Sequence, residues 1–177
     1  MSDRIIIQRV LEGDVEAFSR LVDLHYARCA RVAVRILGNR EDAEEAIQDA
    51  FLRAFKALAD YEDRERYSSS LTRILVNQCR TVLARTKRRD ALFAELDPRR
   101  LEFIVAAELE EGTWAELEHV LERLPAEQRE AIVLKYADDL TYEEMSRITG
   151  AGESALKMRV QRAFARLRAM LQEVPSV

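Results

Sequence analysis

Proline and glycine are scarce in this chain, whose 177 residues include 3 Pro and 5 Gly. These numbers are too low for a protein built from tight hairpins, so a hairpin-rich β fold is excluded. Ala, Leu, Arg and Glu, which lose little conformational freedom in a helix, dominate instead. The content of 48% apolar and 34% charged residues is typical of a folded soluble protein. The composition therefore predicts an all-α protein.

Long apolar runs and cysteine are also scarce. The longest apolar runs, such as residues 5–7, are far shorter than the roughly 20 residues that cross a bilayer, so we expect no membrane insertion. The first residues do not have the pattern of a secretory signal, which predicts a cytoplasmic protein. Cys29 and Cys79 lie far apart within helical patterns, and we expect buried thiols rather than a disulfide.

Residues that build catalytic or metal centres are equally few. The chain has 2 His and no glycine-rich phosphate loop. His25 and Cys29 lie one helical turn apart, but two ligands do not make a zinc site, and their apolar helix favours a core position. We expect no enzyme activity, cofactor or metal.

The net charge of −4 is unevenly distributed. Acidic residues cluster at 41–49 and 102–118, whereas residues 71–89 carry Lys and Arg without one acid, and residues 157–168 are basic. A uniformly acidic chain would repel nucleic acid, but separate basic segments favour contact with it.

Glycine and proline divide the chain into helices. We expect an N-terminal helical bundle over 1–89 and a C-terminal helix-turn-helix domain over 113–177, joined by a flexible acidic linker over 90–112 that contains Asp97-Pro98. The expected helices span 14–37, 41–59, 68–86, 113–124, 126–136, 141–148 and 154–172.

Residues 141–160 contain the sharpest local pattern. Thr141 and Glu144 form a capping box, Gly150 and Gly152 permit a sharp turn, and a basic helix follows, which predicts a helix-turn-helix. The last helix has an apolar stripe of Leu156, Val160, Ala163, Phe164 and Leu167. Its other side carries Ser154, Met158 and Gln161 between the cations Lys157 and Arg162, a surface suited to a major groove. For Met158, partner contact and simple surface tolerance remain equally open.

Two further expected helices each have a face that could bind a partner. In 68–86, Arg73, Asn77 and Arg80 align opposite the apolar stripe of Leu71, Ile74, Leu75, Cys79, Val82 and Leu83. The preceding loop has Tyr61 and Tyr67, which either stack on an unpaired base or, as the better-supported alternative, pack on the core. In 41–59, an acidic strip with an exposed Leu52 is either a protein-binding surface or a solvated face.

These segments resemble the extracytoplasmic-function (ECF) group of bacterial sigma factors over nearly the whole chain. DAEEAIQDAFLRAF at 42–55 is similar to the core-binding helix of region two, and LTRILVNQCR at 71–80 is similar to the promoter-melting helix. Residues 124–168 are similar to region four. A helix-turn-helix alone is common among regulators, but both blocks in this order are specific to the family.

The resemblance implies core RNA polymerase and promoter DNA as partners, and an anti-sigma factor as inhibitor. It implies that core polymerase is bound by Asp42, Glu45, Gln48, Asp49, Leu52 and Arg53. It implies that the −10 element is bound by Tyr61, Tyr67, Arg73, Asn77 and Arg80. It implies that the −35 element is read by Ser154, Lys157, Met158, Gln161 and Arg162.

Two positions depart from the family pattern: Ser70 stands where an aromatic residue is usual, and Met158 where a small polar residue is common. Two other classes of protein remain as alternatives. A stand-alone helix-turn-helix regulator would bind an operator without polymerase. An interaction protein that antagonises a sigma factor would need no DNA-facing helix, which the basic faces argue against.

Overall fold

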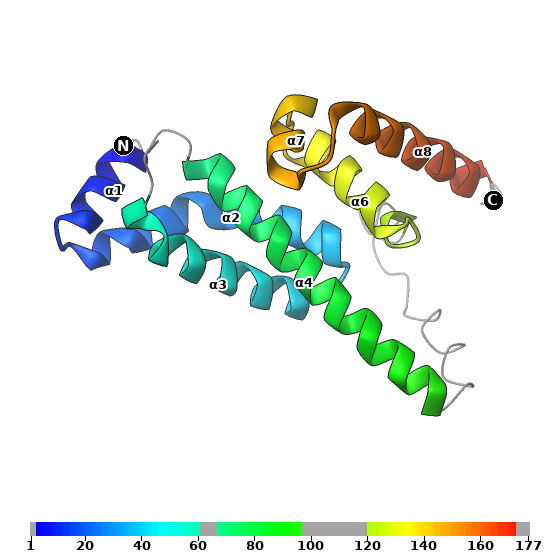
Figure 1. The fold of residues 1–177 in the computed structure, drawn as a ribbon, viewed down its shortest axis with the longest axis horizontal. Helices are drawn as coiled ribbons and strands as arrows, with labels where there is room; N and C mark the ends of the chain where they lie inside the picture. The colour runs from blue at the N-terminus through cyan, green and yellow to red at the C-terminus, as the bar shows by residue number, and fades with distance from the viewer. Residues whose placement is uncertain (1–2, 61–66, 97–119, 173–177) are drawn as a thin grey trace.

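The computed structural model describes residues 3–60, 67–96 and 120–172, and every regular element in these ranges is helical. The all-α prediction is confirmed. The first half contains α1 (Asp3–Leu11), α2 (Phe18–Leu37), α3 (Arg40–Lys56) and α4 (Tyr67–Leu96), with short 3-10 helices at Val15–Ala17 and Leu58–Asp60 (Figure 1). The second half contains α6 (Ala126–Ile132), a π-helical turn at Val133–Ala137, α7 (Tyr142–Thr149) and α8 (Glu153–Gln172).

Helices α2, α3 and α4 form the bundle of the N-terminal half. Their facing stripes bury Leu21, Ile36, Ile47, Leu71 and Leu75, each at most 2% exposed. Gly38 ends α2 with a left-handed φ of 71°, and Asn39 then caps α3 by accepting hydrogen bonds from the backbone of its first turn. The two long helices therefore reverse direction within two residues.

Helix α1 was missing from the expected elements. Ile6 and Ile7 are buried in the core whereas Ile5 is 52% exposed. Three consecutive isoleucines conceal a 3.6-residue period, so the short run did not indicate which side of a helix would be buried.

Helix α4 extends ten residues beyond its expected end at Thr86 and enters the stretch assigned to the linker. No glycine or proline interrupts this stretch before Pro98, and proline disfavours helical backbone at the residue before it. The rest of the expected linker, and most of the helix expected at 113–124, lie outside the described residues.

The helix-turn-helix lies where the sequence predicts it. Thr141 Oγ1 accepts from the Glu144 backbone N–H at 3.2 Å, and the Glu144 carboxylate accepts from the Thr141 N–H at 2.8 Å. This second hydrogen bond lowers the pKa of Glu144. Gly150 adopts φ 74°, whereas Gly152 has no left-handed φ, so one glycine rather than two makes the turn.

The apolar stripe of α8 is buried as expected, except at Phe164. This side chain is 45% exposed, and its ring meets Tyr136 edge-on with the centroids 5.3 Å apart. The Tyr136 ring, on the π-helical turn, is itself 59% exposed. Helical spacing placed Phe164 in the core because it follows Leu156 by eight residues and Val160 by four, and both of these are buried.

Both cysteines are confirmed as buried free thiols, with Cys29 4% and Cys79 0% exposed. Burial raises the pKa of each to about 12. His25 is only partly buried rather than in the core, and it hydrogen-bonds Asp3 at 2.9 Å. Across the described ranges, no three metal-ligating side chains gather and no helix is long and apolar enough to span a membrane.

We predict that Thr141→Ala lowers the free energy of unfolding by about 1 kcal/mol, because α7 loses the side-chain acceptor at its N-terminus. Urea denaturation at neutral pH measures the change. Thr81→Ala is the matched control, since the Thr81 hydroxyl only donates to the Asn77 carbonyl on the exposed side of α4. Equal effects of the two substitutions would contradict the capping role.

Candidate functional site

One face of α3 carries all six residues assigned to polymerase binding: Asp42, Glu45, Gln48, Asp49, Leu52 and Arg53. All are exposed except Asp42, which is half-buried, and Leu52 reaches 58% exposure. The opposite stripe, from Ala43 to Leu58, is buried against α2 and α4 as expected. The structure therefore brings these six residues together as one surface, the α3 face.

An arginine from α4 joins the α3 face. Arg85 donates from both terminal nitrogens to the two carboxylate oxygens of Glu45, at 2.7 Å each. This pairing lowers the pKa of Glu45 and raises that of Arg85, whose charge also interacts with Asp42 and Asp49. The sequence placed Arg85 only in a basic segment, because its partner lies 40 residues away in the chain.

The −10 residues do not form one surface. Arg73 and Asn77 are exposed on α4, whereas Tyr67 is fully buried, with its ring centroid 5.5 Å from that of His25. The position of Tyr67 matches the core-packing alternative. Tyr61 lies outside the described residues.

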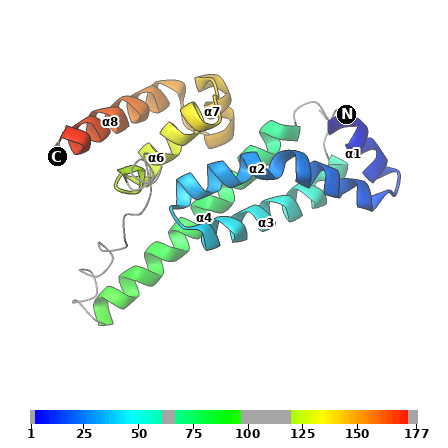
Figure 2. The same ribbon diagram turned by 180° about the vertical axis from the view of Figure 1, so that it is seen from behind.

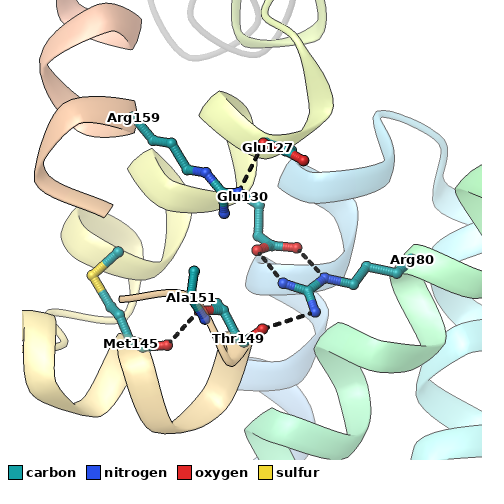
Figure 3. A network of polar contacts seen from close by, with 7 residues as sticks. All are labelled: Arg80, Glu127, Glu130, Met145, Thr149, Ala151 and Arg159. Atoms are coloured by element: carbon teal, nitrogen blue, oxygen red, sulfur yellow. Dashed lines mark hydrogen bonds and ion pairs between the residues drawn. The ribbon is translucent and has the colours of Figure 1, made fainter. Parts of the chain in front are cut away.

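Arg80 is turned toward the C-terminal half (Figure 3). Its Nε and Nη2 donate to the two oxygens of Glu130, both at 2.8 Å, and Nη1 donates to the Thr149 carbonyl at 3.2 Å. That carbonyl belongs to the last turn of α7, where the helix dipole favours a cation. The pairing with Glu130 raises the pKa of Arg80. Sequence spacing put Arg80 in line with Asn77 but gave no sign of this partner, 50 residues away.

The −35 residues do form one surface on α8. Ser154, Lys157, Met158, Gln161 and Arg162 are all exposed, and Met158 is confirmed as pointing outward, at 46% exposure. Lys157 lies over the Tyr142 ring, 5.5 Å from its centroid. Arg159 lies beside Met158 and Arg162 at the edge of this surface and pairs with Glu127 of α6 at 2.9 Å (Figure 3).

The two surfaces and the exposed residues of α4 differ in chemistry. The α3 face combines acids with an exposed leucine, which suits a protein partner carrying basic and apolar groups. The α8 surface combines two cations with Ser, Met and Gln, which suits phosphates at the rim of a groove and base edges within it. On α4, the exposed Arg73 and Asn77 offer a charge and an amide to a nucleic-acid strand.

Two family models match the chain: Sigma-70 region 2 over residues 21–89 and Sigma-70, region 4, over residues 114–167. The RNA polymerase sigma factor NccH of Alcaligenes xylosoxydans is 32% identical over 96% of this chain and 95% of its own length. The ECF RNA polymerase sigma factor SigM of Mycobacterium tuberculosis is 32% identical, covering 96% of this chain and 85% of the relative. The ECF sigma-E factor of Escherichia coli is 28% identical over 92% of this chain and 91% of its own.

Solved structures agree with these relatives. CnrH, in complex with the cytosolic domain of CnrY, superposes with a TM-score of 0.70 at 27% identity, covering 98% of this chain and 99% of that one. The sigma factor RpoE of Bartonella quintana, in complex with the anti-sigma factor NepR, has the same fold, with a TM-score of 0.71 at 24% identity over 89% of this chain and 98% of its own. The chain belongs to the ECF group of RNA polymerase sigma factors.

Proposed function

We propose that this sigma factor binds core RNA polymerase through the α3 face and directs initiation at promoters read by α4 and α8. The observation that carries the proposal is that the α3 face, with five of its six residues exposed and Asp42 half-buried, and the five exposed residues of the α8 surface are presented at the same time. In this division of labour, residues 1–89 bind polymerase and the −10 element, residues 113–177 bind the −35 element, and the chain between them is a linker. No residue is assigned a catalytic role, since the polymerase carries out the chemistry.

We further propose that an anti-sigma factor holds this protein inactive in the cytoplasm. The support is that CnrH, similar over 98% of this chain, was solved with the cytosolic domain of CnrY. An inhibitor that covers the α3 face would exclude polymerase directly, because both partners would need the same acidic and apolar groups.

Charge reversal on the α3 face tests the polymerase contact. We predict that Asp42→Lys with Asp49→Lys reduces run-off transcription from the DNA upstream of the gene by at least about tenfold, because like charges then face the polymerase. The assay uses purified bacterial core polymerase and the full chain.

The matched control is Glu16→Lys with Asp23→Lys, which changes net charge equally at exposed positions off the α3 face. Discrete start sites with the wild type and the control, and their loss with the α3 variant, are the expected result. If the wild type initiates nowhere yet binds duplex DNA tightly on its own, a stand-alone regulator replaces the proposal.

Substitution of Met158 tests base reading by α8. A methionine facing the groove can contact a thymine methyl group, so Met158→Ser should reduce thymine preference at one −35 position by about fourfold, the effect of one buried methyl group. Binding of the reconstituted holoenzyme to duplexes varied across the −35 element measures it. Ala169→Ser, exposed farther along α8, is the control. An unchanged preference at every position would show that Met158 is only tolerated at the surface.

A further inference from the structure

The two halves of the chain are held against each other by ion pairs in which the acid is buried and the arginine partly exposed. Arg28 of α2 donates to both carboxylate oxygens of Asp138, with Nη2 2.8 Å from Oδ2, and also to Ser68 at the start of α4. The Asp138 side chain is 2% exposed. A carboxylate at this depth needs a cation beside it, and its own half of the chain does not supply this one.

Arg80 of α4 and Glu130 of α6 form a second ion pair of the same kind. The Glu130 side chain is 7% exposed and accepts the two hydrogen bonds from Arg80 of the N-terminal half. In both pairs, the N-terminal half provides the arginine and the C-terminal half the buried acid. Pairing raises the pKa of both arginines, as expected for cations that stabilise neighbouring carboxylates.

A third contact brings the halves together independently of these charges. A Cβ added at Gly38 would lie 2.8 Å from Oε1 of Glu122, so the end of α2 closely approaches the start of the C-terminal half. Val34 of α2 and Leu121 line the same narrow gap. Figures 1 and 2 show α6 and α7 beside α2 and α4 from opposite sides.

This closed arrangement cannot bind both promoter elements at once. Their centres are about 25 base pairs apart, or about 85 Å of B-form DNA. Arg80 contacts Thr149 at 3.2 Å, Asn77 is one turn from Arg80, and Met158 is nine residues from Thr149. Asn77 and Met158 are therefore less than about 50 Å apart, even if the intervening chain were fully extended.

We propose that Arg28–Asp138 and Arg80–Glu130 form a latch that holds the free sigma factor closed, with the Glu130 carboxylate occupying the arginine that otherwise binds promoter phosphate. The inference rests on the proposed function, since it uses the −10 role of Arg80. When the latch opens, a promoter phosphate replaces the Glu130 carboxylate as the partner of Arg80. Promoter binding and closure therefore exclude each other.

The first test measures the distance between the halves in the full chain. Spin labels on Arg20→Cys in α2 and Arg168→Cys in α8 report it by double electron–electron resonance; both positions are exposed. Since burial raises the pKa of Cys29 and Cys79 to about 12, these thiols react slowly with the label. We predict that Glu130→Gln with Asp138→Asn shifts the distances to longer values.

The same variant should bind a duplex spanning both elements about tenfold more tightly than the wild type, if the wild type is open one-tenth of the time. The control, Asp139→Asn with Glu143→Gln, removes two exposed acids of the C-terminal half, and the partner of Glu143 is Arg147 in the same half. It should keep the wild-type distances and affinity. Wild-type distances in the latch variant would overturn the proposal.

Exchanging the two charges of one pair tests the latch even if circular dichroism shows that Glu130→Gln with Asp138→Asn does not fold. Arg80→Glu should open the chain, and Arg80→Glu with Glu130→Arg should close it again. Identical distances in the single and double variants would overturn the latch. Failure of the proposed function looks different: run-off transcription with core polymerase would then be absent for the wild type and all variants, whatever the distances.

Discussion

Two carboxylates buried in the C-terminal half, Asp138 and Glu130, constrain the whole molecule, because a buried anion is tolerated only beside a cation. Their cations come from α2 and α4, whose other faces build the N-terminal core. The position of the helix-turn-helix is therefore tied to α4, which exposes Arg73 and Asn77, and to α2, which packs against α3. Packing within each half sets the geometry of its own surface, while the ion pairs set the relation between the halves.

The negative net charge is compatible with promoter binding once the partners of the arginines are known. Arg28, Arg80, Arg85 and Arg159 are each paired with a carboxylate, so much of the basic character of the sequence is used internally. On α8, Lys157 also lies 3.7 Å from a carboxylate oxygen of Glu153. Such a chain gains most of its affinity for DNA from the polymerase that holds it, and this restricts binding to promoters over other DNA.

Local patterns in the sequence were sufficient for much of this structure. The capping box at Thr141, the α3 stripe and the outward position of Met158 follow from helical spacing, since each depends on residues within a few turns. The arginine partners could not be predicted, because they join residues 40 to 110 positions apart. The positions of Tyr67 and Phe164 also depended on tertiary packing. Tyr67, at a helix junction, is buried in the core, whereas Phe164, on the apolar stripe of α8, is partly exposed.

The buried thiols have a consequence for how this protein can respond to its surroundings. With a pKa of about 12, Cys29 and Cys79 carry almost no thiolate at neutral pH, and thiolate is the form that peroxides oxidise. These are the only cysteines in the chain. The two thiols of the folded protein are therefore insensitive to peroxides. Oxidative stress, if it is a signal for this regulator, must reach it by a route other than oxidation of its cysteines.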